Sequence, residues 1–167
     1  YIGIAIGAAH NTKKLPVHKL QELCARLDHP LILLGGREDY ENAREIAGVD
    51  PVKVYNACGN FGINESADMV RRSKLMVSHD TGLMHIGAAF QKPVISIWGN
   101  TIPEFGMAPY YGDRSKQKYD VVEIKNLYCR PCSKIGYDKC PKKHFRCMED
   151  IRVDEILSLI NTRLGRS

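Results

Sequence analysis

The chain has 167 residues, of which 44% are hydrophobic and 26% charged, and its formal net charge is +5. This length suits one domain with a single core. No apolar run approaches the ~20 residues that cross a bilayer. Outside Lys134 to Arg146 the basic residues are too dispersed for a nucleic-acid surface, where dense phosphate contacts dominate the affinity. We therefore expect one globular domain over residues 1–167, with no transmembrane segment and no nucleic-acid partner.

The first residues predict a buried strand, Ile2–Gly7, with neither the basic start nor the long apolar stretch of a signal peptide. The chain has no initiator Met and opens directly on this strand. We interpret it as an excised domain or a fragment whose N-terminal partner is absent. Six cysteines are too few for a disulfide scaffold in a domain of this size, so we expect a reducing compartment.

Short β-branched runs alternate with segments of helical period, which is typical of parallel βαβ units. Strands are predicted at Ile2–Gly7, Leu31–Leu34, Val52–Tyr55, Leu75–Ser78, Val94–Trp98 and Val121–Ile124. Helices are predicted from Pro16, over Glu38–Ala47, from a cap at Asn64 or Ser66 to about Ser73, and over Thr81–Phe90 and Val153–Leu164. The pattern indicates an α/β fold with a doubly wound, Rossmann-like parallel sheet. Ligands of such sheets bind at the carboxyl ends of the strands.

A strand passes directly into a helix at Asp80, Thr81 and Gly82. The free N–H groups and positive dipole end of that helix favour a phosphate, and glycine lets the oxygens approach the backbone. His85 follows one turn later and could turn its ring toward the same ligand. A plain alternative is that Asp80 only caps the helix, since Asp is a preferred N-cap residue.

This region carries a family resemblance. The run Asp80-Thr81-Gly82-Leu83-Met84-His85, followed by Ala88-Ala89, Lys92-Pro93-Val94 and Gly99-Asn100-Thr101, resembles the hallmark of the heptosyltransferases, glycosyltransferase family 9. Thr12-Lys13-Lys14-Leu15-Pro16 is similar to the family's Thr-Lys-Lys/Arg-Trp-Pro segment, with Leu15 in place of the aromatic residue. Gly35-Gly36-Arg37-Glu38 is similar to its turn with an acidic residue for the nucleoside. The resemblance covers essentially the whole chain as the C-terminal, donor-binding half of a GT-B glycosyltransferase.

The resemblance implies roles for residues that also make physical sense where they stand. Lys13 would contact the donor's phosphates and Glu38 the ribose hydroxyls, with Thr12 adding a hydroxyl to the phosphate oxygens. Phe61 could pack on an adenine, although core packing is its ordinary alternative. Asp80 and His85 would position the sugar or its phosphates, and Thr81 and Gly82 would receive the diphosphate. This set contains no catalytic residue.

The resemblance further implies transfer of heptose from ADP-heptose to a lipopolysaccharide core acceptor, with inversion at the anomeric carbon and no required metal. The base and the site for the lipid-linked saccharide acceptor would lie in the missing N-terminal domain. We therefore expect a cytoplasmic protein, peripheral to the inner membrane at full length, whose isolated chain binds nucleotide without transfer. Another nucleotide sugar, or a non-catalytic nucleotide-binding or zinc-binding module, remains the alternative.

Two segments, Gly99–Lys118 and Asn126–Asp150, are long for loops in a compact domain, and loops of this length are often functional. The second, Asn126–Asp150, is the cysteine-rich segment. It contains Cys129, Cys132, Cys140 and Cys147, with His144 nearby. The spacing of the first cysteine pair suits zinc, whereas the later spacings are looser. A structural zinc site, free thiols and disulfides all remain open.

Overall fold

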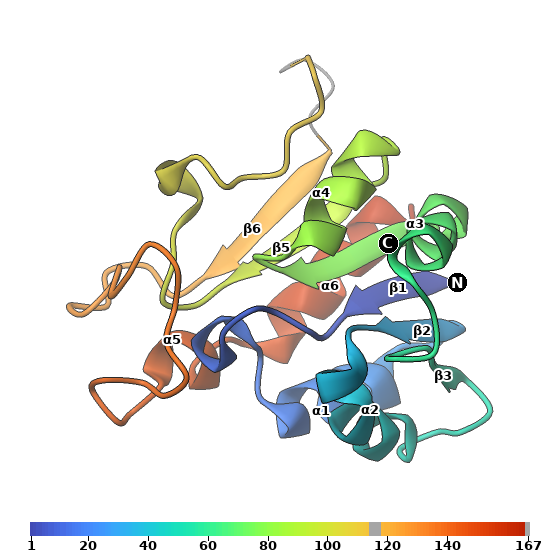
Figure 1. Ribbon diagram of the computed structural model, residues 1–167, viewed down its shortest axis with the longest axis horizontal. Coiled ribbons are helices and arrows are strands. Elements are labelled where there is room, and N and C mark those ends of the chain that lie inside the picture. Colours follow the sequence, from blue (N-terminus) through green and yellow to red (C-terminus); the bar gives the residue numbers. More distant parts are fainter. Residues whose placement is uncertain (114–117, 166–167) are drawn as a thin grey trace.

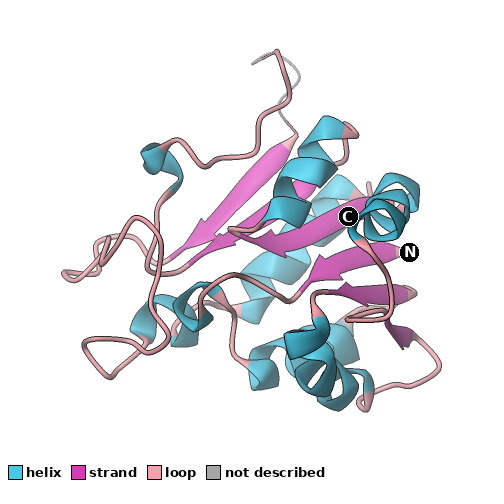
Figure 2. Ribbon diagram, in the orientation of Figure 1, coloured by secondary structure: helices cyan, strands magenta, loops and turns pink. Residues whose placement is uncertain are grey.

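The structure is a computed structural model that describes residues 1–113 and 118–165. It contains one parallel sheet with helices on both faces (Figures 1 and 2). The strand order is β3-β2-β1-β4-β5-β6, so the α/β, doubly wound sheet predicted from the sequence is confirmed. The strands are β1 (Ile2–Ala5), β2 (Leu31–Leu34), β3 (Val54–Asn56), β4 (Leu75–His79), β5 (Val94–Trp98) and β6 (Tyr119–Glu123).

The helices fall between these strands. The α-helices are α1 (Val17–Arg26), α2 (Tyr40–Ala47), α3 (Ile63–Arg72), α4 (Gly82–Ala89), α5 (Arg146–Glu149) and α6 (Val153–Arg163). Three short 3-10 helices are η1 (Asn11–Lys13), η2 (Arg37–Asp39) and η3 (Pro103–Phe105). No helix in the described part of the chain is long and apolar enough to span a membrane.

Successive side chains of each strand point to opposite faces of the sheet. Because helices cover both faces, both sets of side chains are buried. Ile2 and Ile4 of β1 belong to the larger apolar cluster, which includes residues of α1, α2 and α6. Ala5 belongs to the second cluster, with residues of α3 and α4. Burial of these two layers supplies the main stabilisation of the fold.

The strand order fixes where a ligand can bind. β1 pairs with β2 on one side and with β4 on the other, so the chain changes direction of winding between β1 and β4. In doubly wound sheets this switch point opens a crevice at the carboxyl ends of the strands. The loops after β1, β2 and β4 therefore surround the expected binding position.

Some predicted boundaries were wrong. The strand expected at Val52–Tyr55 starts at Val54, because an Asp50 turn precedes it: the Lys53 N–H donates to the Asp50 side chain at 3.1 Å, and Val52 is fully exposed. The third helix is capped at Gly62. Its N–H donates to the Glu65 carboxylate at 2.6 Å, which leaves Asn64 and Ser66 inside the helix.

Other differences are smaller. The second helix begins with the 3-10 turn η2, while Pro16 and Thr81 are N-cap residues of helices that start one position later. The short helix α5 was not predicted in the cysteine-rich segment. Part of the predicted loop Gly99–Lys118, residues 114–117, lies outside the described residues.

Candidate functional site

A cavity of about 350 Å³ lies at the switch point, within the usual size range of small-molecule sites. It is enclosed by the carboxyl ends of β1 and β2 and by the first turns of α3 and α4. Small residues form the floor, so that a ligand can approach the backbone closely. These residues are Gly7, Ala8, Ala9, Gly35 and Gly36.

The first turn of α4 forms one end of this cavity through Thr81, Gly82 and Leu83. Thr81 is the N-cap residue, in an extended conformation, and its side chain makes no capping hydrogen bond. The first backbone N–H groups of a helix have no partner within the helix, and its dipole end is positive. A β-carbon added to Gly82 would meet nothing within 4 Å, so Gly82 borders open space in the cavity that it lines. This end of the cavity suits an anion.

An acid and an aromatic ring also line the cavity. Glu38 lies in η2, immediately after β2, and its carboxylate lies against Gly36, where a β-carbon would overlap it. Phe61 lies ahead of α3 and remains 37% exposed, which is unusual for a side chain packed in a core. A carboxylate can accept hydrogen bonds from hydroxyl groups while an exposed ring offers a flat apolar face. Of the eight candidate residues, Glu38, Phe61, Thr81 and Gly82 line this cavity.

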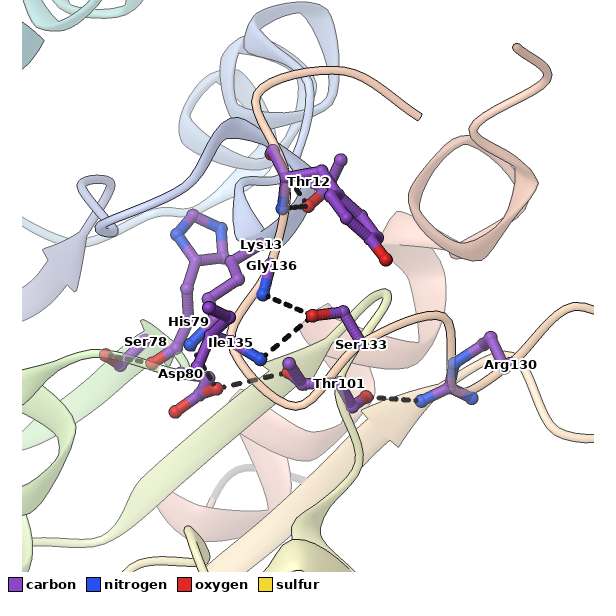
Figure 3. A network of polar contacts seen from close by, with 11 residues as sticks. Thr12, Lys13, Ser78, His79, Asp80, Thr101, Arg130, Ser133, Ile135 and Gly136 are labelled. Carbon is purple, nitrogen blue, oxygen red and sulfur yellow. Dashed lines mark hydrogen bonds and ion pairs between the residues drawn. The ribbon is translucent and has the colours of Figure 1, made fainter. Parts of the chain in front are cut away.

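Lys13 and Asp80 form an ion pair beside the cavity. Lys13 Nζ lies 2.7 Å from Asp80 Oδ2, and the two side chains are only 12% and 8% exposed. The Thr101 hydroxyl donates to the same carboxylate oxygen at 3.1 Å, as Figure 3 shows. Asp80 therefore does not cap α4. Its charge is neutralised by Lys13, next to Thr81, the N-cap residue of α4.

Two other predicted ligands occupy unexpected positions. The Thr12 hydroxyl is buried and committed to Tyr137: it donates to the Tyr137 carbonyl at 2.9 Å and accepts from the Tyr137 N–H at 2.8 Å. Thr12 therefore holds η1, which carries Lys13, against the cysteine-rich segment. His85 is exposed on α4 and is not among the residues that line the cavity.

Sequence reasoning missed Lys14 and Asp39. The two side chains pair at 2.7 Å, and Asp39 is only 2% exposed. Its other oxygen accepts a hydrogen bond from the Gly36 N–H at 3.0 Å. A β-carbon on either Gly7 or Gly35 would overlap the Asp39 carboxylate, so these glycines leave room for it. In the sequence, the feature that could have indicated the buried Asp39 is the pair of glycines, Gly7 and Gly35, that follow two neighbouring strands.

His79, the last residue of β4, was also missed. Its Nε2 accepts a hydrogen bond from the Leu15 N–H at 2.8 Å, so the neutral ring carries its proton on Nδ1. Burial lowers the pKa of His79 to about 4, although the neighbouring backbone of Gly7 acts in the opposite direction. Lys14 contributes to the lowering and Asp39 opposes it. The ring thus joins the loop after β1 to β4 as a neutral group.

This pKa predicts a pH dependence of stability. The unfolded chain binds a proton at His79 near pH 6.5, whereas the folded chain does so only near pH 4. The free energy of unfolding should therefore fall as the pH drops below about 6.5, by about 2.5 kcal/mol at pH 4.5 from this residue alone. Urea denaturation at a series of pH values measures this loss. The His79→Gln variant keeps an acceptor for Leu15 and should show a shallower decline; an equally steep decline in both proteins would contradict the assignment.

Arg130 links the cysteine-rich segment to the site. Its guanidinium group is 5% exposed and pairs with Glu123 at 2.8 Å. It also donates to the carbonyl groups of Gly99, Ile124 and Thr101. Because the Thr101 hydroxyl in turn donates to Asp80, Arg130 supports the loop that holds the acid of the ion pair (Figure 3).

The cysteines themselves are thiols in this structure. Cys129, Cys132, Cys140 and Cys147 are unbonded, and no three His, Cys, Asp or Glu side chains of residues 1–113 and 118–165 gather in a metal-ligating group. Burial raises the pKa of the Cys147 thiol to about 12, and burial together with Cys129 raises the pKa of Cys132. The Cys132 thiol donates to the Cys129 carbonyl at 2.8 Å.

A larger hollow, of about 660 Å³, lies between the end of α1 and α6. Arg26 lines it but is held by Glu22 and Asp154 at 2.7 and 2.6 Å. This hollow lies away from the carboxyl ends of the strands and contains none of the candidate residues. We therefore assign the functional site to the smaller cavity.

Comparison with known proteins agrees with the fold. The model of glycosyltransferase family 9 (heptosyltransferase) matches residues 1–140. Lipooligosaccharide heptosyltransferase 2 of Campylobacter jejuni is 26% identical over an alignment of 144 positions, which covers 83% of this chain and 42% of the relative. The protein of the same name from Haemophilus ducreyi is 30% identical over an alignment of 174 positions, gaps included, which covers 98% of this chain and 47% of the relative.

Among solved structures, the E. coli ADP-heptose lps heptosyltransferase II superposes with a TM-score of 0.77 at 21% identity. The match covers 98% of this chain and 46% of that one. At this identity the likeness concerns the fold. The chain spans less than half the length of each of these relatives.

Proposed function

The chain belongs to glycosyltransferase family 9, the heptosyltransferase family, and from this membership we propose that it is the nucleotide-sugar-binding half of a heptosyltransferase. The proposed donor is an ADP-sugar, ADP-heptose, and the proposed acceptor is the core saccharide of a lipopolysaccharide. A second half of the protein, outside this chain, would bind the acceptor. The names of the relatives, which are heptosyltransferases of lipooligosaccharide or lipopolysaccharide, support this choice of substrates.

The observation that carries the proposal is the arrangement of the cavity at the switch point. The start of α4, with Thr81, Gly82 and Leu83, lines this cavity together with Glu38 and Phe61. A nucleoside diphosphate requires both features at once, since its phosphates need positive dipoles and its nucleoside needs an acceptor for hydroxyl groups and a flat apolar contact. In the proposal, the diphosphate lies at the N-terminus of α4. The ribose hydroxyls donate hydrogen bonds to the Glu38 carboxylate, and the base packs on the Phe61 ring.

The same residues suit the chemistry of glycosyl transfer. When the bond from the sugar to the diphosphate breaks, negative charge develops on the leaving group. Lys13 and the N-terminus of α4 would stabilise that charge in the transition state. Asp80 is already neutralised by Lys13 at 2.7 Å, so it can lie close to a phosphate without strong repulsion and accept a hydrogen bond from a sugar hydroxyl.

The remaining candidates have narrower roles in this proposal. Thr12 acts as a positioning residue, because its hydroxyl is bonded to Tyr137 and it fixes the turn that carries Lys13. His85 is exposed on α4, where it would meet only the part of the donor that extends beyond the cavity. The acceptor's base would come from the other half of the enzyme, and we therefore expect no transfer by this chain alone.

Calorimetric titration of the chain with ADP, and with UDP and GDP as alternatives, tests the proposal. We expect ADP to bind more tightly than the other two nucleotides. Lys13→Ala should weaken ADP binding about tenfold, because it removes one charge-assisted contact to a phosphate. Lys74→Ala is the matched control, since Lys74 is an exposed lysine just before β4, at the opposite edge of the sheet.

Each other outcome has a defined meaning. Preference for UDP or GDP would retain a transferase half but change its donor. If no nucleotide binds to a chain that is folded by circular dichroism, the donor-binding role of this chain is wrong. An equal loss of affinity in Lys13→Ala and Lys74→Ala would show that the effect reflects net charge and not a contact at the site.

A further inference from the structure

The positive charge of the chain is concentrated in one segment. Residues 125–146 contain seven Lys and Arg and one acid, Asp138, which gives this segment a formal charge of +6. The chain as a whole carries +5, so the other residues together carry −1. This contrast is larger than an evenly solvated surface would give.

Most of these cations lack an acidic partner. Five lysines of the segment are exposed and make no ion pair with any residue in the described ranges: Lys125, Lys134, Lys139, Lys142 and Lys143. Elsewhere on the surface, Arg26, Arg44 and Arg71 are each paired with a carboxylate at 2.6 to 2.7 Å. The uncompensated charge of the segment is therefore available to an external anionic partner.

Exposed apolar side chains lie among the lysines. Tyr128 is 77% exposed, Ile135 is 66% exposed and Tyr137 is 42% exposed. Large side chains of this kind cost free energy when they face water, and Tyr is favoured at membrane interfaces because it has an apolar body and a polar tip. The combination of cations with Tyr and Ile is typical of surfaces that lie at the headgroup level of a bilayer.

The segment is held in place at the rim of the site. Figure 1 shows it as the orange loops at the left, beyond the carboxyl ends of β5 and β6. Tyr137 fixes it to Thr12 and Arg130 fixes it to the loop after β5. Lys139 and Lys143 line a hollow of about 350 Å³, which Asp138 also lines. The lysines are thus presented by a surface that is fixed to η1 and to the loop after β5.

We propose that residues 125–146 dock this chain on a lipid bilayer with an anionic surface. The lysines attract the headgroups, and Tyr128, Ile135 and Tyr137 lie at the boundary with the acyl chains. An exposed aliphatic side chain such as Ile135 gains free energy at a bilayer but offers no face for base stacking, which favours lipid over a single-stranded nucleic acid. The inference rests on this surface alone and holds whatever nucleotide the cavity binds.

Sedimentation with vesicles tests the proposal. The chain should bind vesicles of phosphatidylcholine mixed with phosphatidylglycerol and should not bind phosphatidylcholine alone. Lys142→Gln combined with Lys143→Gln should lower the partition coefficient about 25-fold, since each basic residue near an anionic surface contributes roughly fivefold. The control, Lys74→Gln with Lys92→Gln, changes the net charge equally at the amino-terminal edge of the sheet and should have little effect.

The Ile135→Ser variant tests whether apolar contact contributes to binding in addition to charge. It should weaken binding to the mixed vesicles without altering the dependence on salt, because it removes apolar contact and no charge. Failure of the folded chain to bind mixed vesicles would overturn the proposal. So would an equal loss in the two double variants, an unchanged affinity of Ile135→Ser, or complete displacement from vesicles by inorganic phosphate at an ionic strength matched with chloride.

Discussion

Replacing Arg130 by Met is expected to lower the free energy of unfolding by about 3 to 5 kcal/mol, the usual cost of removing one partner from a buried ion pair. Arg130 is 5% exposed, and its partner Glu123 is 11% exposed. The variant would leave the Glu123 carboxylate buried without a cation. It would also leave the carbonyl groups of Gly99 and Thr101 without their donor. A loss of this size is a large fraction of the 5 to 15 kcal/mol that stabilises an ordinary domain.

Urea denaturation of the two proteins measures this difference. Arg152→Met is a suitable control, because Arg152 is 77% exposed and lies 3.7 Å from Asp154, and exposed pairs contribute at most about 1 kcal/mol. Arg130→Lys should lose less than Arg130→Met, since it keeps the charge near Glu123. Equal free energies of unfolding for the Arg130→Met and Arg152→Met variants would show that the buried Arg130–Glu123 pair does not stabilise the fold as expected.

Replacing Gly82 by Ala is expected to lower the affinity for ADP about a hundredfold without lowering the stability of the chain. A β-carbon at this position meets nothing within 4 Å, so the fold itself does not require glycine there. A methyl group would instead project into the open space beside the first turn of α4, in the cavity that Gly82 lines. A phosphate displaced from them loses at least one charge-assisted hydrogen bond together with the helix dipole, which is about 3 kcal/mol.

Calorimetry with ADP and urea denaturation must be carried out on the same Gly82→Ala preparation. A small gain in stability would agree with the expectation, since Ala is favoured over Gly in a helix. Unchanged ADP affinity would remove the N-terminus of α4 from the proposed site. Loss of both affinity and stability would mean that Gly82 serves the fold, contrary to the geometry.

The fold was largely predictable from the sequence because its signals are local. Each strand is a short apolar run, and α1, α4 and α6 carry core residues at helical spacing. The errors arose where one residue type permits several local structures. The Asp50-Pro51 turn delayed β3, and the helix after Phe61 was capped by glycine with Glu65 in place of a Ser or Asn side chain.

The candidate site was predictable only in part. Three of the candidate residues are consecutive in the sequence and directly follow a predicted strand, so the sequence alone predicted that they lie together at the end of that strand. These residues are Asp80, Thr81 and Gly82. Other contacts of the site join residues that are far apart in the chain. These contacts are the ion pair of Lys13 with Asp80, the hydrogen bonds between Thr12 and Tyr137, and the hydrogen bonds of Arg130. No periodicity or short motif specifies such contacts, because they depend on how the loops after different strands meet at one edge of the sheet.

These long-range contacts change the interpretation of two residues. Lys13 was expected to contact the phosphates of a donor, and in the structure it is largely buried in an ion pair with Asp80. Thr12 was expected to offer its hydroxyl to a ligand, whereas it fastens the cysteine-rich segment to η1. If the proposed donor binds here, it would meet side chains that these contacts already hold in place, which would reduce the conformational cost of binding.

The structure of the chain in complex with ADP tests the central claim most directly. We predict that the diphosphate lies on the N–H groups of Gly82 and Leu83 with Lys13 beside it, and that the adenosine lies between Glu38 and Phe61. ADP bound elsewhere, for example in the hollow between α1 and α6, or an orientation that places the phosphates at Glu38, would contradict the claim that this cavity holds the nucleotide of the donor.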